Sequence, residues 1–244
     1  MCGRYRLDAA VDEVAAAFDA EPSPDLEHVR VAERYNIAPT QGVAVVVPRP
    51  DGSAGPDRLL TAMRWGIIPQ WMKPEEGGKP PAGWINARAE TAAEKPAFRG
   101  AFKYRRCVVP ATGFYEWQKP ESGPDRGHKV PHAVAPADGG CLGFAGLWET
   151  WSAPDGSKLD TVTILTTAPN AEMRELHDRM PVVLDPADHD RWMTTPPEEA
   201  PSLTTLLRPA PDGTLEATPV SRRVNNPRHD DASCLEPADP TTLF

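Results

Sequence analysis

Short apolar runs, separated by breaks rich in proline and glycine, constrain what this chain of 244 residues can fold into. Its 29 prolines and 18 glycines are typical of a loop-rich protein, while 7 tryptophans and repeated Val/Leu/Ile runs argue against disorder. Strand-like runs outnumber helical ones and alternate with them irregularly. This pattern predicts an α+β fold with a β-rich core rather than a doubly wound sheet.

The expected elements follow from apolar periodicity and turn residues. Strands are predicted at 43–47, 59–68, 107–110, 113–118, 141–149, 159–167 and near 214–220. Helices are predicted over 8–20, 86–95, 170–177, 185–193 and around 203–207, with Asp8, Asn86, Asn170 and Asp185 as N-caps of the first four. Loops are predicted at 36–41, 49–57, 72–83, 121–128 and 196–202. Because no linker separates two halves, we expect one domain over residues 1–236 and a flexible tail over 237–244.

Several classes of protein are disfavoured. No apolar run approaches the roughly 20 residues that a membrane helix needs, and the N-terminus shows no signal-peptide pattern. The expectation is therefore a cytoplasmic protein with reduced thiols. Its cysteines, at positions 2, 107, 141 and 234, form no C-x-x-C pair, so neither a metal nor a cofactor is expected. Cys107 and Cys141 lie in apolar runs and are expected to be buried.

Charge is distributed unevenly along the chain. The net charge of -9 argues against general affinity for nucleic acid. Residues 60–120, however, carry ten Lys and Arg against five Glu, a local charge of +5, which leaves -14 for the remainder. The same segment holds four of the seven tryptophans. Basic residues among aromatics suit single-stranded nucleic acid, although a basic surface beside a tryptophan-containing core has the same composition.

The chain begins Met-Cys-Gly-Arg-Tyr, and residue 2 is small enough for the initiator methionine to be removed. Removal would leave Cys2 with an α-amine and a thiol on adjacent carbons, both titrating near neutral pH. An aldehyde can form an imine with the amine, and the thiol then closes a five-membered thiazolidine intramolecularly. The competing interpretation is an ordinary start at a disordered terminus. Gly3 and Arg4 favour a site, through close backbone approach and a phosphate contact.

Glu116 and His177 are the candidate proton-transfer groups. Apolar neighbours in the sequence GFYEW would raise the pKa of Glu116, although strand alternation could equally place it with Phe114 on a solvent face. His177, in ELHDRMP, suits a proton shuttle, but an ordinary histidine at a helix end has the same pattern. The dipole of the preceding helix is expected to favour its protonated form.

Asn86 either caps a helix or holds a carbonyl or amine in a site. Arg88 and Arg179 each lie two residues from a candidate, Asn86 and His177 respectively. Two converging arginines would bind an anion such as phosphate; surface salt bridges are the alternative. The chain has no Walker A, dinucleotide-loop, HExxH or GxSxG motif, which disfavours the corresponding enzyme classes.

A series of motifs then carries a family resemblance. They are MCGRY at 1–5, YNIAPTQ at 35–41, RWGIIPQW at 64–71, NARAET at 86–91, FR at 98–99, RRCVVPATGFYEW at 105–117, FAGLWE at 144–149, ILTTAPN at 164–170, LHDRMPVVL at 176–184 and VNNP at 224–227. In this order they resemble the SOS response-associated peptidase family, the abasic-site shield proteins, over roughly residues 2–235. The segments 49–57, 72–83 and 121–128 are expected to be loop insertions.

The resemblance implies a single α+β domain with a β-barrel-like core and a few short peripheral helices. It implies a DNA-damage protein whose Cys2, freed of Met1, crosslinks as a thiazolidine to abasic sites in single-stranded DNA, including junctions with duplex, and shields them from strand cleavage. Autoprocessing would make it a peptidase, and the imine step is lyase-like; general methionine removal could equally expose Cys2. The protein would be cytoplasmic, nucleoid-associated in a bacterium, with no obligate oligomer.

The family's functional positions carry over by motif. The catalytic residues would be Cys2, Asn86 (positioning Cys2), Glu116 (relaying protons) and His177 (opening the sugar ring and reversing the crosslink). The DNA-binding residues would be Arg4, Trp71, Arg88, Arg99, Trp117 and Arg179, with the arginines on phosphates and the tryptophans stacked on bases. Two alternatives remain: a peptidase acting in trans through Cys2, His177 and Asn86, and a non-covalent module that binds single-stranded DNA.

Overall fold

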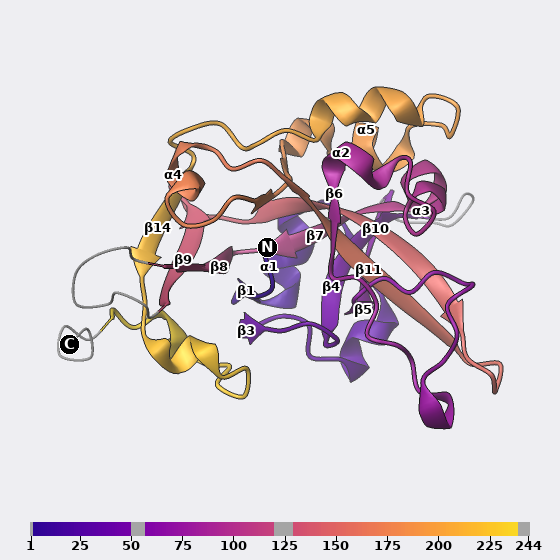
Figure 1. Ribbon diagram of the computed structural model, residues 1–244, viewed down its shortest axis with the longest axis horizontal. Helices are drawn as coiled ribbons and strands as arrows, with labels where there is room; N and C mark the ends of the chain where they lie inside the picture. The colour runs from indigo at the N-terminus through magenta and orange to yellow at the C-terminus, as the bar shows by residue number, and fades with distance from the viewer. Residues whose placement is uncertain (1, 50–56, 120–128, 239–244) are drawn as a thin grey trace.

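Five strands close into a barrel at the centre of the computed structural model, which describes residues 2–49, 57–119 and 129–238 (Figure 1). The strands are β4 (Gly42–Pro48), β5 (Arg58–Trp65), β7 (Arg106–Ala111), β10 (Leu142–Ser152) and β11 (Lys158–Thr167). They run antiparallel in the order β5-β4-β7-β10-β11. A parallel pairing of β11 with β5, where Val162 opposes Trp65, closes the barrel.

A second, five-stranded sheet adjoins the barrel in the order β14-β9-β8-β1-β3. Its strands are β1 (Tyr5–Leu7), β3 (Arg34–Ile37), β8 (Gly113–Gln118), β9 (Val130–Pro136) and β14 (Leu215–Pro219). Strand β8 follows barrel strand β7 after one residue, Thr112, so the two sheets share a continuous stretch of chain. Strand β1 pairs with β3 on one edge and with β8 on the other, which places the N-terminal segment inside the fold.

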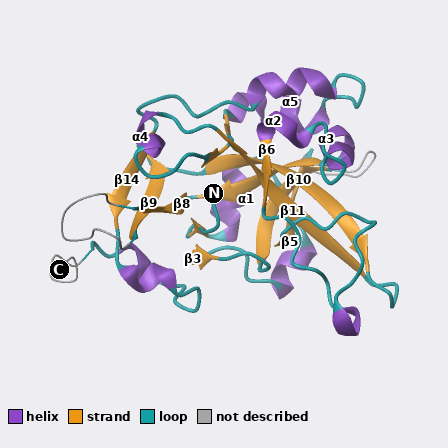
Figure 2. Cartoon of the chain, in the orientation of Figure 1, coloured by secondary structure: helices purple, strands orange, loops and turns teal. Residues whose placement is uncertain are grey.

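The remaining elements are short and peripheral (Figure 2). The helices are α1 (Val11–Ala17), α2 (Ala89–Ala92), α3 (Arg99–Tyr104), α4 (Ala171–Arg174) and α5 (His189–Thr194). The short strands are β2 (Glu21–Pro22), β6 (Asn86–Arg88), β12 (Met180–Pro181) and β13 (Val183–Leu184). Single 3-10 turns lie at Pro24–His28, Glu76–Gly78, Pro186–Asp188, Ala200–Leu206, Arg222–Asn225 and Ala232–Leu235. The predicted α+β domain with a barrel-like core and short helices is confirmed.

Aromatic packing fastens β1 to the barrel. The Tyr5 ring meets Trp65 of β5 edge-on, with centroids 5.2 Å apart, and Phe144 of β10 at 6.2 Å. All three side chains are buried. Each such edge-to-face contact stabilises the fold by about 0.5–1.5 kcal/mol, in addition to the free energy gained by burying the rings. The segment that begins with Cys2 is therefore held on the barrel by packing as well as by its two strand pairings.

Several predicted elements differ from the structure. Asn86 is not a helix cap: residues 86–88 form β6, which pairs in parallel with β11, and the helix begins only at Ala89. The predicted loop at 36–41 begins inside β3, because Asn36 and Ile37 are strand residues. Strands β1 and β9 and helix α3 are absent from the prediction. Two prolines in β9 hide its strand character, since proline cannot donate to a ladder.

The C-terminal segment is tied to β3. Asp230 accepts hydrogen bonds from the backbone N–H groups of Tyr35 (2.7 Å) and Asn36 (2.8 Å) and forms an ion pair with Arg34. The Asn36 amide donates to the carbonyl oxygens of Val224, Asn226 and His229. The VNNP motif thus packs beside β3.

Parts of the prediction lie outside the described residues. The tail at 237–244 is described only to residue 238, and the loops at 49–57 and 121–128 fall largely in the gaps. Within the described ranges, no helix combines the length and the apolar character that crossing a bilayer requires.

Cys107 is buried as expected, whereas Cys141 is half-exposed and Cys234 is buried.

Candidate active site around Cys2

Three segments converge on Cys2. Strand β1 opposes β8 with Tyr5 across from Phe114, and the Tyr115 N–H donates to the Arg4 carbonyl (2.9 Å). Continuing this register places Gly3 across from Glu116. From β6, the Asn86 side-chain amide donates to the Cys2 carbonyl (2.7 Å). The backbone of Cys2 is therefore fixed between β8 and β6, and its side chain is completely buried.

Burial dominates the electrostatics of Cys2 and Glu116. Desolvation raises the pKa of the Cys2 thiol strongly, and the nearby charge of Glu116 raises it further. Glu116 is only 3% exposed, so it does not lie on a solvent face. Desolvation raises its pKa as well. A thiol that keeps its proton thus lies within electrostatic range of a carboxyl group that binds a proton more readily than usual.

His177 lies just after α4, and its own N–H donates to the Met173 carbonyl (2.8 Å). Burial lowers the pKa of His177, although the charge of Asp178, whose Oδ1 lies 2.7 Å from the ring Nδ1, acts in the opposite direction. The lowered pKa runs against the expected effect of the helix dipole: burial is the main cause, and α4, with only four residues, offers little dipole. The backbone N–H of Arg179 lies against the same Nδ1 (3.1 Å).

Glu116 and His177 share one electrostatic environment. The charge of Lys129, which precedes β9, lowers the pKa of both groups as a minor effect. The Gln118 amide of β8 reaches the Glu175 carbonyl after α4 (3.5 Å) and so joins the two segments. Two titratable side chains from distant parts of the sequence therefore lie within range of the same lysine charge.

Arg4 and Trp117 form one unit with the C-terminal segment. The Arg4 guanidinium lies over the Trp117 ring, 5.8 Å from its centroid, and donates from Nη1 to Asn36 Oδ1 (2.8 Å) and the Val224 carbonyl (2.9 Å). Trp117 donates from Nε1 to Asn225 Oδ1 (2.7 Å). Both side chains are thus held in fixed orientations beside Cys2. Asn36, which organises this unit, is a residue that the sequence analysis did not single out.

Arg88 and Arg179 meet beside Thr166 of β11. Arg88 is the strand partner of Thr166 and is exposed, whereas Arg179 donates to the Thr166 carbonyl. Arg179 also forms a two-pronged ion pair with Glu90 (2.6 and 2.8 Å). Arg88 is therefore the more accessible of the two for an anion.

An aromatic surface lies beside the loop that follows β5. Trp71 is 62% exposed and Trp84 is 36% exposed, with ring centroids 6.1 Å apart. Trp84 meets the buried Phe98 edge-on at 6.0 Å, and Phe98 directly precedes Arg99 at the start of α3. Trp84 and Phe98 were not predicted as site residues, although Phe98 lies in one of the motifs. Together the exposed rings could stack on unpaired bases.

We expect Trp71→Ala to weaken binding of single-stranded DNA by about 1–3 kcal/mol, because a stacking surface is lost. The fold should be unaffected, since this side chain is mostly exposed. Fluorescence anisotropy with a labelled single strand measures the loss. Tyr104→Ala, which removes another exposed ring (61%), is the matched control and should change affinity little. Equal losses in both variants would contradict the assignment.

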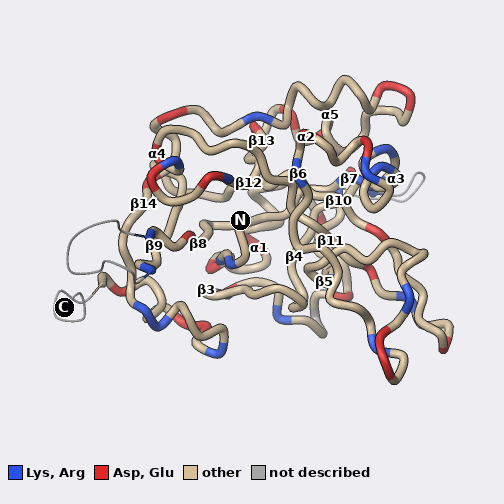
Figure 3. Tube along the Cα trace, viewed as in Figure 1, with Lys and Arg blue, Asp and Glu red and all other residues tan. Residues whose placement is uncertain are grey.

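The basic segment 60–120 does not form one surface. Arg106 is buried and donates to the carbonyls of Phe102, Lys103 and Trp192, and Arg105 pairs with Glu149 (2.5 Å). Figure 3 shows the cations scattered along the chain. The local charge of +5 in the sequence therefore overstates how basic the surface is, because Arg105 and Arg106 make contacts within the fold.

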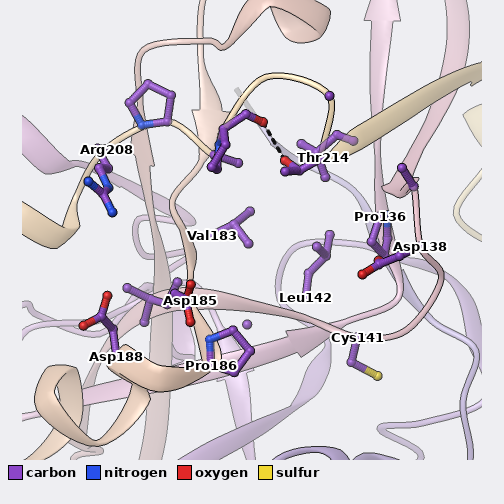
Figure 4. Close-up of a pocket in the computed structure, with 18 of the residues that line it drawn as sticks. Pro136, Asp138, Cys141, Leu142, Val183, Asp185, Pro186, Asp188, Arg208 and Thr214 are labelled. Carbon is purple, nitrogen blue, oxygen red and sulfur yellow. Dashed lines mark hydrogen bonds between the residues drawn. The ribbon is translucent and has the colours of Figure 1, made fainter.

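One cavity of the protein lies apart from these residues. A cavity of about 510 Å³ between the β9–β10 connection, β13 and the loop before β14 is lined by Leu142, Val183 and Asp185 among others (Figure 4). None of the predicted site residues is among those that line it. Within the described part of the chain, no group of three or more His, Cys, Asp or Glu side chains could hold a metal ion.

The fold and the site define a class: a single-domain barrel protein with a cysteine at position 2 clamped beside a buried carboxyl group. The family model described as SOS response associated peptidase (SRAP) matches residues 1–227, so the chain belongs to this family.

Curated relatives match over nearly the whole chain. The chain is 40% identical to the abasic site processing protein YoaM and 37% identical to YoqW, both of Bacillus subtilis, covering 97% of this chain and 98–99% of theirs. It is 30% identical to abasic site processing protein HMCES of Xenopus tropicalis, covering 96% of this chain and 78% of that protein. Among solved structures, a Bacteroides thetaiotaomicron protein superimposes with a TM-score of 0.79 at 24% identity, covering 98% of this chain and 100% of that one, which supports the fold alone.

Proposed function

We propose that this protein processes abasic sites in DNA by forming a thiazolidine between Cys2 and the ring-opened sugar, after removal of Met1. Abasic-site processing is the activity that the names of its full-length relatives state. The observation that carries the covalent chemistry is the clamp on Cys2: Asn86 binds its carbonyl, and the buried Glu116 of β8 lies close enough for its charge to act on the Cys2 thiol. An α-amine and a thiol on one fixed residue can both reach a single aldehyde carbon.

The reaction proceeds in balanced steps. The Cys2 amine attacks the sugar C1′ aldehyde and forms a carbinolamine. Protonated Glu116 gives its proton to the departing hydroxyl group, so that water leaves and an iminium ion remains. The Glu116 carboxylate then takes the thiol proton while the sulfur bonds to C1′, which closes the thiazolidine and restores the acid. The raised pKa values of Glu116 and Cys2 suit these roles, since each group holds its proton until that step.

Asn86 and His177 have supporting roles. Asn86 Oδ1 is buried and has no hydrogen-bond partner among the described residues. A buried acceptor without a donor is costly, so it is suited to receive an N–H of the Cys2 amine once Met1 is gone. His177 can give a proton to the sugar ring oxygen during opening and during reversal. These assignments follow the chemistry of the groups.

Single-stranded DNA is the proposed partner. The exposed rings of Trp71 and Trp84 offer stacking surfaces for unpaired bases, and exposed Arg88 and Arg99 offer phosphate contacts. A junction with duplex would place paired bases next to this surface. The net charge of -9 is compatible with such a local contact, because only the groups near the strand need be basic.

The alternative of a peptidase acting in trans has less support. A Cys-His-Asn arrangement would use the asparagine to orient the histidine ring. Here the Asn86 amide binds the Cys2 carbonyl, and Arg179 holds the Nδ1 of His177. Cleavage by the protein itself of the bond after Met1 remains part of the proposal, alongside removal by a general aminopeptidase in the cytoplasm.

Intact mass spectrometry tests the proposal. Purified protein is measured before and after incubation with a single-stranded oligonucleotide that carries one abasic site. We expect protein without Met1 to gain the mass of the DNA minus one water, with no reductant present. An otherwise identical oligonucleotide without the abasic site is the control and should give no adduct. Met-free protein that gains no mass would overturn the proposed function.

A further inference from the structure

Glu90 occupies a connecting position between two halves of the site. It lies in α2, four residues after Asn86, whose amide holds the Cys2 carbonyl. Its carboxylate binds both terminal nitrogens of Arg179, at 2.6 Å from Nη1 and 2.8 Å from Nη2. Arg179 in turn is two residues from His177. One ion pair thus joins the segment that holds Cys2 to the segment that presents His177.

The ion pair spans one end of β11. On one side, β6 pairs with β11 through Asn86 opposite Ile164 and Arg88 opposite Thr166. On the other side, β12 pairs with β11 through Pro181 opposite Thr166. Both pairings are short, three residues and two residues respectively. Short pairings alone fix the relative positions of two segments weakly, so the Glu90–Arg179 contact adds the missing connection across the strand.

Arg179 has a geometry suited to positioning. Its side chain is only 14% exposed, against 51% for Glu90. Two of its five N–H groups bind Glu90, and another donates to the Thr166 carbonyl. Its backbone N–H donates to the Nδ1 of His177 (3.1 Å). An Arg179 side chain held by both Glu90 and Thr166 fixes this turn, and the turn fixes the position of the His177 ring.

We propose that Glu90 is a positioning residue: by holding Arg179, it keeps the His177 turn in register with the segment that clamps Cys2. This inference rests on the function proposed above and assigns that site a residue which touches none of the reacting atoms. The opposite idea is that Glu90 stands in for a DNA phosphate and is displaced when DNA binds. The two ideas predict opposite effects of removing the carboxylate.

The first test follows the reaction with Glu90→Ala and Glu90→Gln, each with saturating abasic single-stranded DNA. We expect the rate constant for adduct formation to fall about tenfold in Glu90→Ala, because displacement of a catalytic group by a fraction of an ångström has large effects. Glu90→Gln keeps the shape of the side chain and one hydrogen-bond acceptor, so the rate constant should fall less in this variant. In a Cys2→Ser background, affinity for a strand with a tetrahydrofuran abasic analogue should remain within about twofold of the parent, since phosphate contacts are retained.

The second test does not require DNA. Proton NMR follows the titration of His177 in the free protein. Besides burial, the charges that act on this ring are those of the N-terminal amine and Lys129, which lower its pKa, and of Asp178, which raises it. Burial is the main cause that lowers the pKa of His177, so a turn loosened by Glu90→Ala should expose the ring and move this pKa upward toward its ordinary value. A generally destabilised protein would not show this selective shift.

Asp190→Ala is the matched control. Asp190 is an exposed carboxylate that binds Arg58, a largely covered arginine, in a similar pair. It should leave the adduct rate and the His177 titration unchanged. An unchanged rate and titration in Glu90→Ala would overturn the positioning role, as would tighter binding of DNA. If wild-type protein forms no adduct, the proposed function fails, yet the His177 titration still decides whether Glu90 positions the ring.

Discussion

Cys2→Ala is expected to abolish the stable adduct with abasic DNA, lowering its rate of formation by more than about a thousandfold. Alanine at position 2 still permits methionine removal and still carries an α-amine. It can therefore form the imine but cannot close the ring, and the imine hydrolyses. The measurement is denaturing gel electrophoresis of protein incubated with labelled abasic DNA, with and without borohydride.

Borohydride supplies the internal control for this variant. It reduces an imine to a permanent bond, so Cys2→Ala should give an adduct with borohydride and none without it. Wild-type protein should give the adduct in both lanes. Because Cys2 is part of the buried core, the melting temperature of the variant is compared with that of the wild type. A folded Cys2→Ala protein that forms a stable adduct without reductant would refute the thiazolidine.

Glu116→Gln is expected to slow adduct formation by about 10²-fold or more, the usual contribution of a general acid. Gln occupies the same volume but neither gives nor accepts the proton. Burial raises the pKa of Glu116, so the wild-type carboxyl group acts as an acid up to a higher pH than an ordinary one, and its contribution declines as pH rises through that pKa. This decline should be absent in Glu116→Gln. The measurement is the rate of adduct formation in quenched time courses across a pH series.

Glu149→Gln is the matched control for Glu116→Gln. Glu149 is also a buried carboxyl group, but its partners are Arg105 and Gln70. This variant should keep the wild-type pH dependence even if the protein is less stable. A pH profile in Glu116→Gln that falls at the same pH as in wild-type protein would assign the titration to another group.

The strands of the barrel could be predicted from the sequence because they carry strong local signals, whereas their closure into a barrel was implied only by the family resemblance. The run from Val43 to Val47 is apolar throughout, as a strand covered on both faces requires. Strand β1 has no such signal: three residues form it only because β3 and β8 lie on either side. The helical prediction at 86–95 failed at its start for a similar reason, since pairing with β11 overrides the local capping preference of Asn86.

The candidate site was partly predictable. Cys2, Glu116 and His177 could be singled out by residue chemistry, but their environments depend on contacts made by distant segments. The alternation of residues along the strand did not decide whether Glu116 faces solvent or the interior. Its side chain is buried because neighbouring elements cover β8. The Glu90–Arg179 pair joins residues 89 positions apart, which no local pattern indicates. Likewise, burial lowers the pKa of half-buried His177, which a short helix motif does not reveal.

The central position of β1 has a mechanical consequence for a crosslinked molecule. DNA attached to Cys2 would pull on a strand that is hydrogen-bonded along both edges and anchored by the buried ring of Tyr5. Fraying of a chain end cannot release such an attachment, and a protease cannot reach it until the sheet itself opens. If the proposed crosslink forms, its survival against proteolysis should therefore depend on how often this sheet opens.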